Sequence, residues 1–181
     1  PQPDPLGFLE YSVVYTDRAL NHMSQRFQGV MRDISRILKA VYNANSAVVI
    51  PGSGTFGMEA VARQFATGKK ALVIRNGWFS YRWTQIFDMG RFPASSTVLK
   101  ARRVGTGSQA AWIPCPVDEV VARIKAEKPD VVFAFFAGGG AVKFVKDYDA
   151  AGLKKSIPLV GSGFLTDGTL EAQGASAQGL I

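Results

Sequence analysis

The chain has 181 residues, of which 47% are hydrophobic, and its formal net charge is +7. This length and apolar content predict one compact domain with a buried core, or one domain joined to a partial second one. The single cysteine, Cys115, excludes an internal disulfide and most cysteine metal sites, and we expect no metal site. No apolar run reaches membrane-spanning length and no signal-peptide pattern opens the chain, so a cytoplasmic protein is expected.

The positive charge is scattered along the chain. The densest basic cluster is residues 100–103, with Arg91 nearby, and no long lysine or arginine run and no nucleic-acid motif is present. Dispersed positive charge is typical of a solvated face and is compatible with a small anionic ligand. We therefore expect neither a nucleic-acid partner nor a membrane partner.

The first segment of the chain predicts an arm followed by a helix. Pro1–Pro5 is too rich in proline for regular structure, and residues 11–15 suit a short extended piece. From Leu20 to Val41 apolar residues recur every three or four positions, which predicts a long amphipathic helix.

Five short apolar runs follow, separated by helical patterns. They predict strands near residues 47–50, 71–75, 96–100, 131–136 and 157–160. Helices are expected to start near Phe56, Trp78, Pro116 and Gly138, and the glycine-rich stretch 104–114 is expected to be a surface loop. Strands that are apolar throughout and alternate with helices indicate a three-layer α/β fold, with a mostly parallel sheet flanked by helices.

A glycine-rich turn, Gly52–Thr55, lies between the first of these strands and its helix. Small residues let backbone N–H groups approach an anion, and a helix N-terminus adds partial positive charge, so the turn favours a phosphate-bearing ligand. Gly52–Gly57 also fits the G-x-G-x-x-G dinucleotide pattern, and Arg75 would suit a 2′-phosphate, so an NADP-binding Rossmann-like domain is one alternative. A purely structural glycine turn is another.

Three motifs in order carry a more specific resemblance. They are His22 with Arg26-Phe27, Ser53-Gly54-Thr55 followed by Glu59-Ala60, and residues 76–82, which read Asn-Gly-Trp-Phe-Ser-Tyr-Arg. Through them, residues 6–134 resemble the N-terminal part of a class V aminotransferase, which is a fold-type-I pyridoxal-phosphate enzyme.

That resemblance implies a cofactor site. In the family, the Ser-Gly-Thr turn holds the phosphate of pyridoxal 5'-phosphate, so Ser53, Gly54 and Thr55 would be cofactor-binding residues. An aromatic residue of the Asn-Gly motif stacks on the pyridine ring, a role that would fall to Phe79; packing in the helix core is the alternative for this side chain. His22 is expected to be structural rather than catalytic.

The catalytic groups of that family have no counterpart here. The strand near residues 157–160 is followed by Gly161-Ser162 instead of an aspartate. None of the lysines at 143, 146, 154 and 155 matches the Schiff-base lysine. Because transamination needs both groups, we expect no catalytic residues and an inactive domain. The parent enzymes are dimers, so self-association into a homo-oligomer is expected.

The last part of the chain resembles a different family. Residues 133–181 are similar to part of one lobe of type I periplasmic binding proteins of the branched-chain amino-acid transport class. A change of family at a shared strand suggests a chimera joined near Lys128–Ala134. Residues 1–134 would then be the aminotransferase-like part, and residues 135–181 a βα segment that completes the same sheet.

The interpretation that follows is a truncated or chimeric pyridoxal-phosphate-dependent aminotransferase-like domain that retains a phosphate-binding turn. Two alternatives remain open beside the NADP-binding one. The chain could be an amino-acid solute-binding module of the ABC transporter type, or a designed fold chimera with no ligand.

Overall fold

The structure is a computed structural model that describes residues 22–181. It divides into two compact units, residues 1–51 and residues 52–181. The arm expected at Pro1–Pro5 and the extended piece expected at residues 11–15 lie outside the described residues.

In the first unit, helix α1 spans Gln25–Tyr42, and the start predicted at Leu20 lies outside the described residues. The helix begins here because the Ser24 hydroxyl accepts the Phe27 N–H at 3.1 Å and thereby caps the first turn. None of the helices among residues 22–181 is long and apolar enough to cross a membrane.

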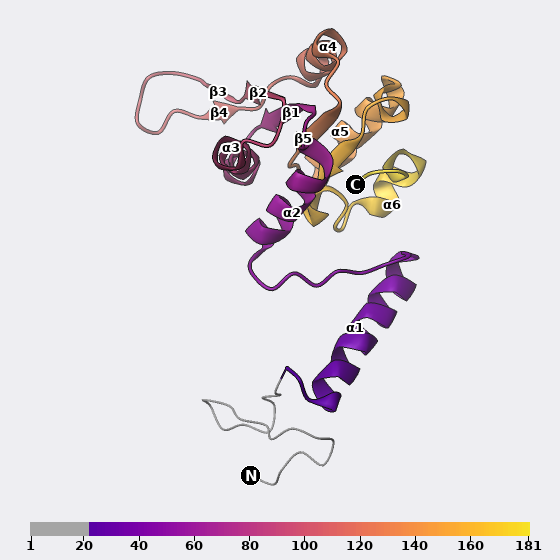
Figure 1. Ribbon diagram of the computed structural model, residues 1–181. Helices are drawn as coiled ribbons and strands as arrows, with labels where there is room; N and C mark the ends of the chain where they lie inside the picture. The colour runs from indigo at the N-terminus through magenta and orange to yellow at the C-terminus, as the bar shows by residue number, and fades with distance from the viewer. Residues whose placement is uncertain (1–21) are drawn as a thin grey trace. The chain divides into compact units, whose positions relative to one another are not determined.

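The second unit alternates strands and helices (Figure 1). Its principal strands are β1 (Lys70–Arg75), β2 (Ser95–Lys100), β5 (Val131–Ala134) and β6 (Leu159–Gly161). Its helices are α2 (Gly54–Ala66), α3 (Trp78–Gly90), α4 (Val117–Glu127), α5 (Gly138–Ala150) and α6 (Leu170–Gln173). A short hairpin of β3 (Arg102–Arg103) and β4 (Trp112–Ile113) and three 3₁₀ turns, η1 (Leu153–Lys155), η2 (Gly163–Leu165) and η3 (Gly174–Ala177), complete it.

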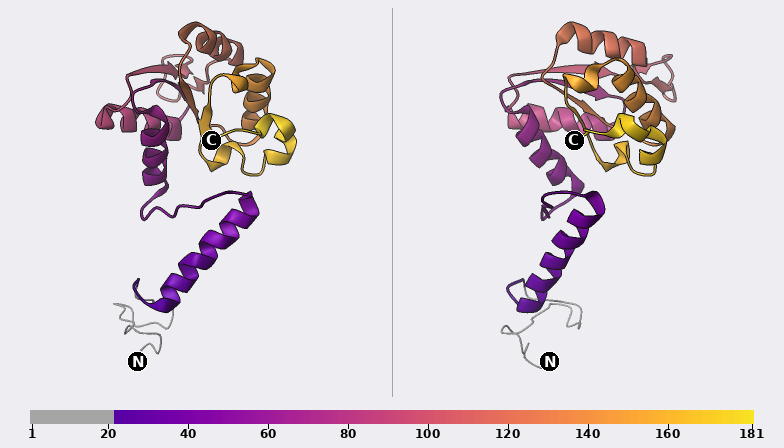
Figure 2. Two further views of the ribbon diagram at one scale, coloured as in Figure 1. Left: turned by 45° about the vertical axis from the view of Figure 1, so that its right-hand side comes forward. Right: turned by 90° about the vertical axis from the view of Figure 1, so that its right-hand side faces the viewer.

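The four principal strands form one parallel sheet in the order β2-β1-β5-β6. In the register, Val73 of β1 pairs with Val98 of β2 and with Phe133 of β5, and Phe133 pairs with Val160 of β6. One sheet therefore continues across the junction expected near residues 128–134. Helices cover both of its faces (Figure 2), which confirms the predicted three-layer α/β fold with a mostly parallel sheet.

The two faces of the sheet bury separate cores because neighbouring residues of a strand point to opposite sides. Ala71 and Val73 of β1 pack with α2 and α3, in a cluster that includes Trp83 and Phe133. Leu72 and Ile74 pack with α4 and α5 on the other face. The strands are thus apolar throughout, as a parallel sheet covered on both sides requires.

The prediction of a strand at residues 47–50 was wrong. These residues have no regular secondary structure, and Val48 is 81% exposed. An apolar run becomes a strand only when a neighbouring strand pairs with its N–H and C=O groups, and no described strand does so here. The strand predicted at residues 131–136 is shorter than expected, because β5 pairs with β6 only as far as Ala134 and Gly161.

Lys154 ties the end of α5 to the C-terminal turns. Its Nζ lies 3.2 Å from Asp149 Oδ1 and donates a hydrogen bond to the Ala175 carbonyl at 3.0 Å. A hydrogen bond from the Ser176 hydroxyl, followed by the one from Lys154, lowers the pKa of Asp149. A carboxylate with a lowered folded-state pKa stabilises the fold above its ordinary pKa of about 3.9, and this stabilisation is lost as the pH falls through the folded-state value.

We therefore expect Asp149→Asn to lower the urea midpoint at about pH 7 and to change it little near pH 2, where the wild-type carboxylate is protonated as well. Urea unfolding followed by circular dichroism at the two pH values measures this. An equal fall in the urea midpoint at both pH values would show that the charge of Asp149 does not provide this stabilisation.

Candidate functional site

The carboxyl ends of the parallel strands lie at one edge of the sheet, and the chain leaves this edge in two directions. After β1 it enters α3 on one face, and after β5 it enters α5 on the other face. Adjacent parallel strands whose connections leave to opposite faces create a crevice at their carboxyl ends, where open α/β sheets hold ligands. A ligand site is therefore expected along this edge.

The predicted phosphate turn forms the start of α2. Ser53 is the N-cap: its hydroxyl accepts the Thr55 N–H at 3.3 Å, and its carbonyl accepts the Phe56 N–H at 2.9 Å. Among residues 22–181, the N–H groups of Ser53 and Gly54 find no acceptor. The turn thus lies at a helix N-terminus, as predicted, but the Thr55 amide is already used within the turn.

Phe79, expected beside a cofactor ring, is the second residue of α3 and is 53% exposed. Its ring stacks on Phe135, with centroids 5.0 Å apart and an interplanar angle of 20°. Phe135 in turn contacts Phe164 at 5.5 Å. In the part of the chain that the structure describes, no hydrogen bond or ring contact joins Phe79 to the turn at residues 53–55, so the predicted cofactor residues do not form one contact group.

Pyridoxal phosphate fits this edge only in part. The free amides of the turn suit a phosphate, but Phe135 covers one face of the Phe79 ring. No carboxylate directly follows any principal strand, since the next residues are Asn76, Ala101, Phe135 and Ser162. The pyridine nitrogen would have no carboxylate partner at a strand end, so we derive no reaction step through this cofactor, and its binding stays a prediction.

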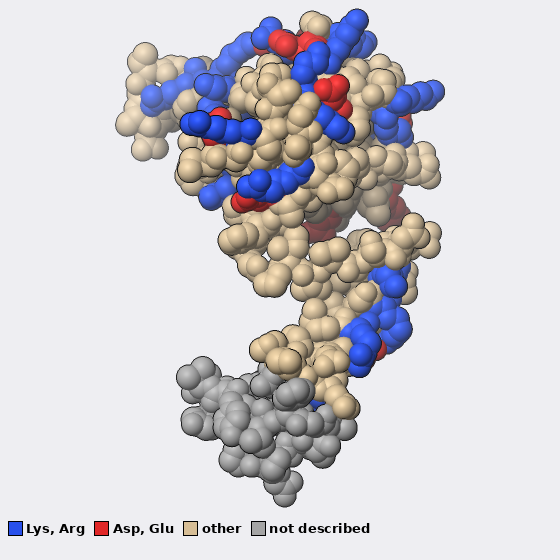
Figure 3. All heavy atoms as spheres, viewed as in Figure 1, with Lys and Arg blue, Asp and Glu red and all other residues tan. Residues whose placement is uncertain are grey.

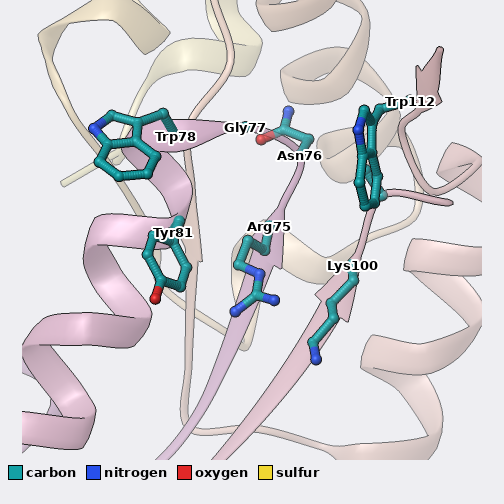
Figure 4. Close-up of a pocket in the computed structure, with 8 residues that line it drawn as sticks. Arg75, Asn76, Gly77, Trp78, Tyr81, Lys100 and Trp112 are labelled. Atoms are coloured by element: carbon teal, nitrogen blue, oxygen red, sulfur yellow. The ribbon is translucent and has the colours of Figure 1, made fainter. Parts of the chain in front are cut away.

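A pocket of about 690 Å³ lies at the carboxyl ends of β1 and β2 (Figure 4). It is lined by Arg75, Asn76, Gly77, Trp78, Tyr81, Lys100, Ala101 and Trp112. Its volume falls within the range of small-molecule sites, about 300–1,000 Å³. No lining residue is acidic and three are aromatic. The pocket therefore suits an anion that carries an apolar part.

Two cations contribute the charge of this pocket. Arg75 and Lys100 are the last residues of β1 and β2 and pair directly in the register, so their side chains leave the sheet on the same face. The Arg75 guanidinium lies over the Tyr81 ring, 5.0 Å from its centroid. Among the described residues, neither cation takes part in an ion pair. Lys and Arg side chains outnumber Asp and Glu around α3, α4 and the hairpin (Figure 3).

The start of α3 adds further donors. The buried Ser80 hydroxyl accepts the N–H groups of Asn76 and Gly77 at 3.0 and 2.9 Å, and it lies 3.0 Å from Asn76 Oδ1. With Oδ1 facing Ser80, Asn76 Nδ2 has no acceptor within residues 22–181. The positive end of the α3 dipole lies at the same place and also favours an anion.

The β3–β4 hairpin supplies Trp112. The Ala101 N–H donates to the Arg75 carbonyl at 2.9 Å, which fixes the point where the chain leaves β2. Arg102 pairs with Glu119 of α4 and ties the hairpin to that helix. Trp112 lies on one side of the pocket, Trp78 and Tyr81 lie on the other, and the two cations lie between them (Figure 4).

The sequence alone does not predict this site. Arg75 was expected only to suit a 2′-phosphate, and Trp112 was expected in a surface loop. The available signal was that two predicted strands each end in a basic residue, Arg75 and Lys100, and that aromatic residues follow both. The sequence does not show that these strands are neighbours, and it is their pairing that brings Arg75 and Lys100 together.

Residues 105–181 match the periplasmic binding protein family. The match confirms the resemblance predicted for the C-terminal segment, and it begins well before residue 133, the start expected for that segment. Trp112 lies inside the matched segment, whereas Arg75 and Lys100 precede it. No curated protein sequence matches the chain.

Solved structures of two classes share this fold. A solute-binding protein of an ABC transporter from R. palustris, in complex with benzoate, has 30% sequence identity and a TM-score of 0.50 over 70% of this chain and 33% of its own. A second, from Rhodopseudomonas palustris BisB5 in complex with 3,4-dihydroxybenzoic acid, has 20% identity and a TM-score of 0.51 over 70% and 34%. A ureidoglycine-glyoxylate aminotransferase from Bacillus subtilis has 18% identity and a TM-score of 0.55 over 82% and 38%.

The chain spans about a third to two fifths of the length of these structures. Its fold is shared by solute-binding proteins and by aminotransferases of the class expected from the sequence motifs. This double likeness is consistent with the predicted chimera of the two.

Proposed function

Because residues 105–181 match the periplasmic binding protein family, we propose that the chain is a solute-binding module that holds a small carboxylate reversibly and performs no chemistry on it. The ligand would occupy the pocket at the carboxyl ends of β1 and β2. The observation that carries the proposal is the pair of register neighbours, Arg75 and Lys100, which have no acidic partner among residues 22–181 and lie between aromatic walls.

Physical chemistry favours a carboxylate in this place. Two cations beside apolar rings attract an anion more strongly than they would in open water, because the rings displace part of the solvent. A hydrogen bond between a guanidinium and a carboxylate contributes about 1.5–3 kcal/mol. Benzoate and 3,4-dihydroxybenzoic acid, which two of the similar solute-binding proteins hold, are both carboxylates. This shared group supports the proposal.

An amino acid is a weaker candidate for this pocket. Its carboxylate would meet the two cations, but its ammonium group would have no acidic side chain among the lining residues. We therefore expect leucine to bind less tightly than an acid of similar size that lacks the ammonium group.

Calorimetric titration with benzoate and with benzamide tests the proposed function. The two ligands have nearly the same shape, but only benzoate is charged. We expect benzoate to bind at least about tenfold more tightly, which corresponds to about 1.4 kcal/mol. We also expect this advantage to shrink at about 0.5 M salt, because salt screens the charges. Equal binding of both ligands, or no binding of benzoate, 4-hydroxybenzoate and hexanoate, would refute the proposal.

A second candidate follows from the start of α2. The unpaired N–H groups of Ser53 and Gly54 favour a truncated pyridoxal-phosphate-dependent domain that still holds a phosphate. We expect phosphorus NMR to show line broadening of added inorganic phosphate and pyridoxal phosphate, and Ser53→Ala to reduce it by loosening the cap. Unbroadened signals from both compounds would count against this candidate.

A further inference from the structure

We propose that this pocket selects aromatic acids over saturated ones, and that Trp112 is the residue that determines the selection. The inference rests on the proposed function, because the carboxylate end of the ligand is assigned to Arg75 and Lys100. It adds the chemical class of the rest of the ligand, which would be a planar ring placed between Trp112 and the pair formed by Trp78 and Tyr81.

Of the three aromatic walls of the pocket, Trp112 is the one that no cation or aromatic ring contacts within residues 22–181. Trp78 and Tyr81 contact each other with centroids 5.7 Å apart and a tilt of 44°, and both indoles that line the pocket, Trp78 and Trp112, are 65% exposed. Among the described residues, Trp112 makes no ring contact with another aromatic side chain. An indole with a free face beside a pocket gains most from a ligand that presents a flat ring.

Trp112 is held in place rather than carried on a loose loop. It pairs with Arg103 in the β3–β4 register, and the Val104 N–H donates to the Ala111 carbonyl at 2.8 Å directly beside this pair. An exposed ion pair between Arg102 and Glu119 also links the hairpin to α4. A positioned indole loses little freedom when a ligand stacks on it, so its contact strengthens binding efficiently.

The cations suit the carboxylate end of a ligand, and the aromatic side chains suit the ring at its other end. The Arg75 guanidinium lies over the Tyr81 ring, 5.0 Å from its centroid, and forms no ion pair among residues 22–181, so its N–H groups can meet a carboxylate. A ring attached directly to that carboxylate would lie between the walls that Figure 4 shows. A saturated acid would satisfy the same cations, but its puckered ring cannot stack flat on an indole.

Benzoate and cyclohexanecarboxylate separate stacking from simple apolar burial. The saturated ring is bulkier and more apolar, so burial alone predicts tighter binding of cyclohexanecarboxylate. Stacking on Trp112 predicts the reverse, with benzoate preferred by about three- to tenfold. Dissociation constants for both acids, measured by calorimetry on the full chain, give this ratio directly.

Substitutions in the β3–β4 hairpin test whether Trp112 determines the preference for benzoate. We expect Trp112→Ala to bring the two dissociation constants within about twofold of each other while changing that of cyclohexanecarboxylate little, and Trp112→Phe to keep most of the preference for benzoate. Ile113→Ala is the matched control, because Ile113 is the neighbouring exposed apolar residue of β4 and does not line the pocket. It should leave both constants unchanged.

Three other binding results would each refute a different claim. If the wild type binds both acids equally, aromatic selection is refuted while carboxylate binding stands. If Trp112→Ala and Ile113→Ala weaken both acids to the same extent, Trp112 only supports the hairpin. If neither acid binds the wild type, the proposed function itself fails and this inference fails with it.

Discussion

Replacing Phe133 with alanine is expected to lower the free energy of unfolding by about 3–5 kcal/mol, the largest loss that we predict for any single core substitution. Phe133 lies in β5, between β1 and β6, and is fully buried. Its ring meets Trp83 at 4.9 Å and, edge to face, Phe87 at 5.0 Å. Removing it leaves a cavity that these large rings cannot easily fill, because α3 holds both of them in place.

A loss of this size removes a large part of the total stability of a domain, which is typically about 5–15 kcal/mol. Urea unfolding followed by circular dichroism measures it. Phe164→Ala is the matched control, since the same side chain is 54% exposed there and its removal should cost less than about 1 kcal/mol. Similar losses for the two variants would show that Phe133 does not lie in the core of this sheet.

Helices α2, α3, α4 and α5 of the second unit were predicted well because their signals are local, whereas α6 was not predicted. The stripe of apolar residues after Trp78 and the stop at Gly90 lie within one segment, and α3 has these same bounds. Gly138 likewise marks the start of α5. Such patterns depend on contacts between residues three or four positions apart, which a single sequence displays.

The strand predicted at residues 47–50 shows where local patterns stop being sufficient. The apolar run there resembles the run in β1, yet only β1 has neighbours on both sides, β2 and β5. Strand formation depends on a pairing strand from elsewhere in the chain, and the apolar segment itself does not show whether such a strand exists. The same limit applies to the candidate pocket, whose residues come from β1, α3, β2 and β4.

The motif at residues 76–82 contains aromatic residues that face two different places at this edge of the sheet. The family resemblance pointed to Phe79, whose ring stacks on Phe135, which in turn contacts Phe164. Trp78 and Tyr81 of the same motif face the pocket with Arg75. Consecutive residues at the start of a helix point in different directions, so one motif can serve two sites, and only the positions of β2 and the hairpin show which side encloses a volume.

Neutralising Arg75 is expected to produce the largest effect on binding. Arg75→Met keeps most of the side-chain length and its contact with Tyr81 but removes the charge. We expect the dissociation constant for benzoate to rise by about ten- to a hundredfold, corresponding to about 1.5–3 kcal/mol, the contribution of a hydrogen bond to a charged group. Benzamide should be affected much less, and Lys100→Met should have a smaller effect than Arg75→Met because Lys100 is more exposed to water.

Arg82→Met separates a local contact from the overall charge of the protein. Arg82 lies on α3 over the Trp78 ring, 5.8 Å from its centroid, but does not line the pocket. The Arg82→Met substitution changes the net charge by the same amount as Arg75→Met. Calorimetric titrations of benzoate into the two variants at equal salt should therefore give a large loss for Arg75→Met and less than about a twofold change for Arg82→Met. Equal losses would mean that benzoate responds to the net charge of the surface and has no defined place between β1 and β2.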